Sequence, residues 1–167
     1  MRKGKLIGYD FFNRPQYERI LATQSLLTRE KKITVKNLPS PTPENFYGTV
    51  SEKFHISSEV DRTNLKTNEA ISFQLSFRGN GNINMLEPFE IEFPESFEVF
   101  EPNVTNKTFI GNSTTGGSKT FEYILIPRED GNFIVSPITF NYFNPRTQQY
   151  IKIKSDKHTI SVEKGKQ

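Results

Sequence analysis

Two histidines, His55 and His158, are the first residues to weigh for chemistry in this sequence of 167 residues. They lie far apart along the chain, and each falls on a solvent-facing position of an expected strand, whereas a metal site needs a cluster of closely spaced ligands. The absence of Cys excludes thiol catalysis, disulfides and Cys-ligated metal centres. We therefore predict surface histidines, no metal site and no cofactor.

Hydroxyl nucleophiles and glycine-rich turns carry no catalytic signal either. Ser113 and Ser118 stand outside any G-x-S-x-G motif and have no histidine nearby in sequence, although proximity in space stays open. The glycine turns at 79–81 and 116–117 lack the lysine and the following helix of a phosphate-binding loop. We predict a protein that is not an enzyme; a pocket uniting a histidine, a carboxylate and a serine would favour a hydrolase.

Glutamates are concentrated between residues 87 and 101, where no lysine or arginine interrupts them. A glycosidase pair requires one buried carboxyl group, and a calcium loop requires alternating Asp and Asn closed by Glu; the segment shows neither pattern. Two interpretations remain: a solvated acidic edge that discourages strand aggregation, or a surface that docks a protein partner. The candidate partner-contact residues here are Glu90, Glu92, Glu95 and Glu98.

Arg128 is the fifth candidate contact residue. It follows Pro127, which ends an apolar run, and it stands at the start of a turn. An exposed arginine is enriched at protein interfaces. It can equally brace its own turn by donating hydrogen bonds to nearby carbonyl groups, and both interpretations stay open.

The charge distribution argues against nucleic acid as a ligand. Residues 1–52 carry nine Lys/Arg against five Asp/Glu, residues 53–149 carry eight against twelve, and residues 150–167 carry five against two. The expected folded body is therefore acidic, whereas a nucleic-acid-binding fold concentrates basic residues on its folded face. No run approaches the roughly 20 apolar residues of a membrane span. The N-terminus is basic but no apolar stretch follows, so we expect no signal peptide there.

The elements that must position these residues are strands. Residues 119–153 alternate apolar and polar side chains and predict three antiparallel strands, with reversals at Asp130-Gly131 and Asn144-Pro145. Further strands are predicted at 54–59, 71–77, 82–86, 103–110 and 158–163. About eight strands at such spacing, with 15 Phe and 6 Tyr for the core, predict an all-β, Ig-like antiparallel β-sandwich of about seven to nine strands.

Several local predictions accompany this fold. Phe97, Val99 and Phe100 are expected to pack inward, and residues 111–118 to form a flexible loop tip. Ile160 and Val162 are expected to point into the core. Residues 17–22 have the spacing of a helical face but also suit extended chain, so both conformations stay open.

Prolines mark the expected domain boundary. Residues 32–38 alternate like a strand and would complete a preceding β domain, of which residues 1–38 are the C-terminal remnant. Three prolines at every second position hold residues 39–45 extended as a linker. The sandwich domain is expected over residues 46–163.

The sequence resembles the BatD family of bacterial oxygen-tolerance (aerotolerance) proteins. The matching stretches are Phe121–Arg128, Gly131–Pro145 and Gln149–Tyr150 in the last third. Upstream, the resemblance covers a hinge at 33–39, a domain start at 45–54, a G-x-G-N turn at 79–82 and the segment 93–102. Asn37 stands where the family has proline and Ser51 where it commonly has glycine, and neither position carries chemistry.

The resemblance implies a scaffold role. Full-length members resemble exported proteins with tandem Ig-like domains and a C-terminal anchor in the inner membrane, so the implied location is the periplasm. The implied partners are other Bat-type proteins, including von Willebrand A-type membrane proteins, and the family offers no catalytic motif to transfer. The alternative is a carbohydrate-binding module of the cell envelope, which would require Tyr142, Phe143 and Tyr150 to face outward as a row.

Overall fold

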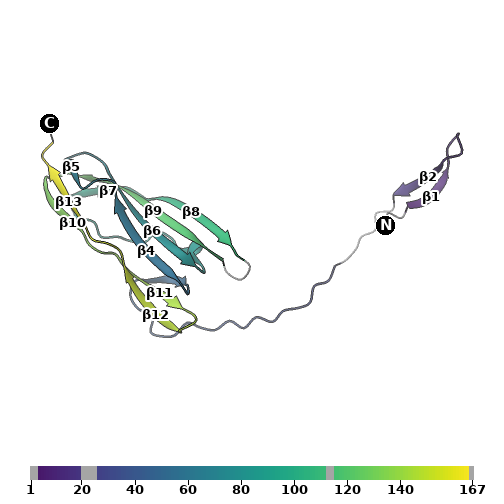
Figure 1. Cartoon of the computed structure of the whole chain (residues 1–167), viewed down its shortest axis with the longest axis horizontal. Coiled ribbons are helices and arrows are strands. Elements are labelled where there is room, and N and C mark those ends of the chain that lie inside the picture. The colour runs from purple at the N-terminus through teal and green to yellow at the C-terminus, as the bar shows by residue number, and fades with distance from the viewer. Residues whose placement is uncertain (1–3, 20–25, 112–114, 166–167) are drawn as a thin grey trace. The chain divides into compact units, whose positions relative to one another are not determined.

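The computed structural model describes residues 4–19, 26–111 and 115–165, and its contacts divide the chain into unit 1 (Met1–Lys36) and unit 2 (Asn37–Gln167). Unit 1 contains an antiparallel hairpin of β1 (Gly4–Tyr9) and β2 (Pro15–Arg19) (Figure 1). In its turn the Asp10 carboxylate accepts hydrogen bonds from the backbone N–H groups of Phe12 and Arg14. Residues 17–19 are thus extended, and the rest of the helix-or-strand question lies outside the described residues.

The strand predicted at residues 32–38 is wrong. This stretch has no regular structure, and Ile33 and Val35 are 83% and 88% exposed. Alternation of apolar residues stabilises a strand only when a neighbouring strand and a core receive them. The described residues offer no such neighbour here.

The first layer of unit 2 is a five-stranded antiparallel sheet. Its order is β4 (Phe54–Val60), β6 (Ile71–Asn80), β9 (Thr115–Pro127) and β7 (Phe97–Val99), and β8 (Asn103–Ile110) also pairs with β9. β7 and β8 occupy successive parts of one edge of β9. The register slips by one residue between them, from Val99↔Leu125 to Asn103↔Glu122, where Pro102 interrupts the ladder.

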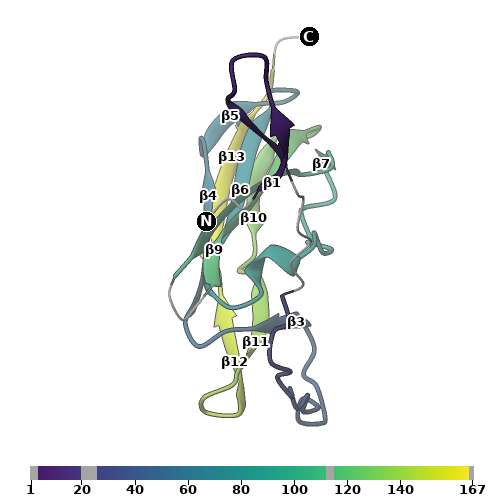
Figure 2. The ribbon, with the colours of Figure 1, turned by 90° about the vertical axis from the view of Figure 1, so that its right-hand side faces the viewer.

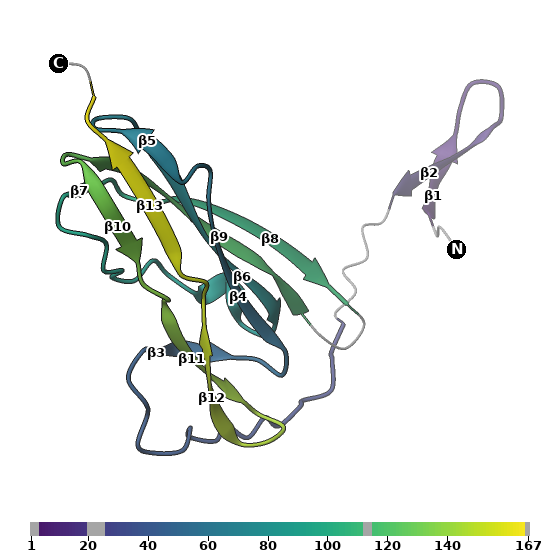
Figure 3. The same cartoon turned by 60° about the vertical axis from the view of Figure 1, so that its left-hand side comes forward.

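The second layer is a long ribbon in one continuous register. β10 (Gly131–Val135) pairs with β13 (His158–Glu163), and β11 (Thr139–Asn144) pairs with β12 (Gln149–Lys154) (Figure 3). Ser155 bridges the interruption, since its N–H donates to Ile138 O and its Oγ accepts from Ile138 N. Short strands β5 (Asn64–Lys66) and β3 (Phe46–Val50) join its two ends in parallel.

The core lies between these layers and is aromatic. Alternate residues of β6 and β9 point into it, and their side chains are almost completely buried. The fully buried rings are Phe73, Phe77, Phe121 and Phe140. The predicted all-β sandwich is confirmed; it has more strands than predicted because long strands are interrupted, and the two short parallel pairings depart from a purely antiparallel arrangement.

Four local predictions need correction. The stretch 119–153 does not form three neighbouring strands, because β9 pairs in the first layer while β10, β11 and β12 belong to the second. Ile83–Met85 forms a 3-10 turn (η1) in place of a strand. Thr115–Ser118 starts β9, and residues 112–114 lie outside the described chain. Val99 and Phe100 are 43% and 45% exposed, although Phe97 is buried as predicted and Ile160 and Val162 are too.

No helix within the described residues is long and apolar enough to cross a membrane.

Figure 2 shows β7 near one end of unit 2 and the β11–β12 hairpin near the other. The chain between η1 and β7 therefore runs along the side of the sandwich, and it carries Glu87, Glu90, Glu92 and Glu95.

Candidate functional site

The segment 87–101, called the acidic segment below, forms no ladder over residues 87–94, and half-buried and exposed side chains alternate over residues 89–93. Residues 87–94 have no regular structure, yet Phe89, Ile91 and Phe93 are half-buried and pack against the core. Glu90 and Glu92 fall between them and are exposed. The apolar side chains therefore fix which way the carboxylates point.

Aromatic contacts hold this segment at two positions. The Phe89 ring stacks on Tyr47 with centroids 4.5 Å apart, and the Phe93 ring lies 5.3 Å from Phe73 and 5.5 Å from Tyr123. Such aromatic pairs contribute roughly 0.5–1.5 kcal/mol beyond the area they bury. Burial around this cluster raises the pKa of the Tyr123 phenol.

Glu95 lies in the turn that follows, where Phe97 N–H donates to Pro94 O over 2.9 Å. Within the described part of unit 2, the carboxylates of Glu90, Glu92 and Glu95 have no ion-pair partner and no hydrogen-bond donor. They are exposed negative charges on a backbone held by its neighbours. The structure thus brings three of the sequence-predicted contact residues onto one segment.

Glu98 and Arg128 are engaged with each other. The Arg128 guanidinium donates from Nε to Glu98 Oε2 at 3.0 Å, with a second donation from Nη2 to the same oxygen, and from Nη1 to Asn68 Oδ1 at 2.6 Å. Both side chains are about half exposed. Arg128 therefore braces β7 against the turn before β6, through side-chain oxygens instead of the carbonyl groups considered from the sequence.

The two histidines differ. His55 is exposed as predicted, but His158 is half-buried: its Nε2 lies 2.7 Å from Ser58 Oγ and its ring meets Phe73 edge-on. Its predicted solvent-facing position is wrong, because His158 shares a strand face with buried Ile160. Ser58 is only 4% exposed, and the described residues place no carboxylate in hydrogen-bond contact with His158.

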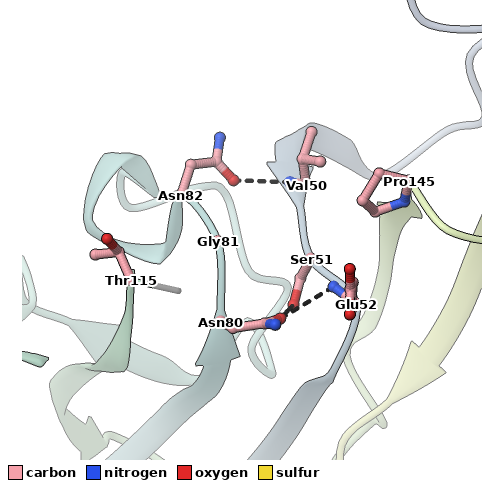
Figure 4. A pocket seen from close by; sticks show the side chains of 8 residues that line it. All are labelled: Val50, Ser51, Glu52, Asn80, Gly81, Asn82, Thr115 and Pro145. Atoms are coloured by element: carbon pink, nitrogen blue, oxygen red, sulfur yellow. Dashed lines mark hydrogen bonds between the residues drawn. The ribbon is translucent and has the colours of Figure 1, made fainter. Parts of the chain in front are cut away.

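The asparagines of the G-x-G-N turn are structural residues that sequence reasoning did not single out. Asn80 Oδ1 accepts from Ser51 Oγ, Glu52 N and Lys53 N, while Asn82 Oδ1 accepts from Val50 N at 2.7 Å (Figure 4). Gly81 has φ +90°, and a Cβ there would stand 2.0 Å from Val50 O, so only glycine fits. The sequence signal for this role was a glycine at the end of a strand with an asparagine on each side.

We call Ser51, Asn80 and Asn82 with the backbone that they hold the asparagine clamp. An open depression of about 360 Å³ lies beside this clamp. Its walls come from the clamp together with Thr115 and Pro145. The side chains of Ser51, Asn80 and Asn82 in its lining already take part in hydrogen bonds within the protein, and neither histidine lines it. Among the described residues, no three His, Asp or Glu side chains gather as metal ligands.

The aromatic row required by a carbohydrate module is not exposed. Tyr142 and Phe143 are 6% and 7% exposed. Tyr150 is half-buried, donates its hydroxyl to Pro39 O and packs on Phe46. These three rings belong to the interior of the β11–β12 end.

One family model matches the chain: it is described as the BatD DUF11-like domain and covers residues 58–162, or 105 of 167 residues. The match begins within β4 and ends within β13, so it spans the acidic segment and both layers of the sandwich. No curated protein and no solved structure matches the chain.

Proposed function

This chain belongs to the BatD family, and we propose that it is a non-catalytic protein-interaction domain of a BatD-like scaffold associated with aerotolerance and stress resistance. The full-length protein is periplasmic and anchored to the inner membrane in this proposal. Its partners are other Bat-type proteins, including von Willebrand A-type membrane proteins. Family membership supports these assignments.

One observation carries the interaction role: Glu90, Glu92 and Glu95 are exposed without ion-pair partners in the described part of unit 2, on a backbone held by half-buried rings. A prearranged surface loses little conformational entropy on binding. Clustered like charges also steer an oppositely charged partner and raise its association rate. The surface therefore suits a basic patch on a protein partner.

The Ser58–His158 contact supports a structural role more than a catalytic one. A serine nucleophile must reach its substrate, and its base needs a group that orients the ring. Ser58 is buried, its Oγ also lies 3.3 Å from the carbonyl of Asp156, and the contact ties β4 to β13. This geometry favours a cross-link between the two layers.

The test is charge reversal on the acidic segment. We expect the triple variant Glu90→Lys, Glu92→Lys and Glu95→Lys to bind a von Willebrand A domain of a Bat-type protein at least about tenfold more weakly, chiefly through slower association. The matched control reverses three exposed glutamates elsewhere in unit 2, Glu59, Glu129 and Glu163. Surface plasmon resonance at two salt concentrations measures both variants. Equal affinities for the two triple variants would remove the acidic surface from the proposal.

A further inference from the structure

β8 is an edge strand, and no other strand in the described residues of unit 2 pairs with its outer side. All eight of its residues are exposed, and β9 is its pairing partner on one side. Figure 3 shows its other side at the margin of unit 2. Backbone N–H and C=O groups along such a margin form a ready template for another strand.

The outer face of the first layer is organised in rows across the strands. The register places hydroxyl side chains in one row and acidic and amide side chains in the next row towards one end. The next row towards the other end contains a histidine, an arginine, a serine and a lysine. The rows are Ser57–Ser76–Thr120–Thr105, Glu59–Gln74–Glu122–Asn103 and His55–Arg78–Ser118–Lys107. Each row ends on β8, so Lys107 lies on one side of Thr105, and Asn103, whose neighbour on β9 is Glu122, lies on the other.

We propose that β8 pairs antiparallel with β8 of a second copy of this chain, across a two-fold axis at Thr105. Rotation about that axis sets Lys107 opposite Asn103 of the other copy, in line with the row that contains Glu122. The basic row of each copy then continues into the acidic row of its mate, twice by symmetry. The hydroxyl row continues into itself, with Thr105 beside Thr105, a favourable cross-strand pair.

Other registers satisfy fewer of these conditions. An axis between two residues would set the outer face of one copy beside the inner face of the other, because side chains alternate along a strand. An axis at Lys107 would place two lysines directly opposite each other. An axis at Asn106 aligns Lys107 with the uncharged hydroxyl row, and one at Val104 pairs only residues 103–105 of β8.

The absence of native Cys makes the register directly testable. Opposed residues of an antiparallel pair have Cα atoms about 4.5–5.5 Å apart, which suits a disulfide. We expect the 167-residue chain with Thr105→Cys to form a disulfide-linked dimer under mild oxidation, reversed by reductant. The matched control is Ser57→Cys, at the other edge of the same row and also exposed. It should remain largely uncross-linked.

Charge exchange tests the complementarity separately. Sedimentation velocity of the wild-type chain over rising concentration should show a monomer–dimer equilibrium, weak because a five-residue ladder buries little area. Lys107→Glu should weaken the dimer, because it brings a second negative charge into the row that contains Glu122, and Lys107→Glu with Glu122→Lys should restore it. A wild-type monomer at every concentration, equal cross-linking of the two Cys variants, or stronger cross-linking at another β8 position would overturn the proposal. Charge reversal at the acidic segment leaves β8 unchanged, so this result stands apart from the proposed function.

Discussion

Residues 87–94 and strand β8 are held to the sandwich in opposite ways. The first stretch makes no ladder, but every second side chain is half-buried against the core. β8 makes a regular ladder with β9 over eight residues, yet all its side chains are exposed. Side-chain burial and backbone pairing therefore hold a segment to the sandwich independently of each other. In residues 87–94 the carboxylates stay exposed, whereas in β8 the backbone groups along the outer edge stay unpaired within the described part of unit 2.

The energetic consequence is that the irregular stretch is expected to be the more firmly held of the two. Complete burial of a Phe side chain contributes roughly 1.5–3 kcal/mol, and the aromatic contacts of Phe89 and Phe93 add to their partial burial, whereas a hydrogen bond exchanged with water contributes about 1 kcal/mol net. An exposed strand is also open to local fraying. Regular secondary structure alone is a poor guide to local stability here.

Removing a ring from each region gives the largest expected contrast. Phe89→Ala should lower the free energy of unfolding by about 2–4 kcal/mol, because the ring packs among Tyr47, Phe77 and Phe140. Phe109→Ala on β8, where the ring is 55% exposed, should cost less than about 1 kcal/mol. Urea unfolding measures both. Equal losses would contradict the view that burial anchors only the first region.

Gly117→Ala targets the ladder instead. A Cβ at Gly117 would stand 2.2 Å from Lys107 O, so β8 must move away from β9. We expect a loss of about 1–3 kcal/mol and faster amide exchange confined to β8 and its partner residues. Hydrogen exchange read by mass spectrometry measures this, with Ser118→Ala as the control on the same strand. Unchanged protection of β8 would show that the pairing tolerates the methyl group.

Alternation predicted these two regions from sequence to different extents. It placed β4, β6, β8 and β13 correctly, because each of them is one uninterrupted strand. In each of them, either one face is buried or one edge pairs with a neighbouring strand. It failed at residues 32–38, where no partner strand receives the pattern, and it joined β10 to β11 across Pro137. Alternation predicts which side chains share a face. Whether a ladder forms depends on a neighbouring strand, and that strand is often distant in sequence.

In the candidate site, too, the exposure of side chains was predictable from the sequence, whereas contacts between distant residues were not. The exposure of Glu90 and Glu92 follows from Phe89, Ile91 and Phe93 being apolar, a signal present in the sequence. The half-buried position of His158 was also within reach, since Ile160 and Val162 on the same face were expected inside. The Ser58–His158 contact and the Arg128–Glu98–Asn68 link join residues far apart in the chain, so only the folded arrangement reveals them.

A smaller effect is expected at the Arg128–Glu98 pair, which adds an ionic anchor to β7. The pair is about half exposed, so its coupling should be roughly 0.2–1 kcal/mol and should weaken in high salt. A double-mutant cycle with Arg128→Met and Glu98→Gln measures it by urea unfolding at low and high ionic strength. Coupling that is large and insensitive to salt would mean that the pair is shielded from solvent and contributes more to anchoring β7 than its exposure implies.

The smallest expected effect concerns Tyr123. The pKa of its phenol depends on how closely residues 87–94 pack against the core. Burial raises the pKa of its phenol above the value near 10 of the unfolded chain. As pH rises, the unfolded chain releases this proton first, so stability declines from about pH 10 and levels off only above the higher pKa of the folded state. Tyr123→Phe should flatten that decline in alkaline urea unfolding.

Phe93 connects the Tyr123 pKa to the comparison of residues 87–94 with β8, because the centroids of the Phe93 and Tyr123 rings lie 5.5 Å apart. Phe93→Leu opens the cluster to water and should bring the Tyr123 pKa closer to 10, measured from its ring carbon shift by NMR. Phe109→Leu on β8 makes an equal change to an exposed ring and should leave that pKa where it is. If both substitutions moved it equally, the seating of the acidic segment would be a property of the whole sheet and not of the rings beneath it.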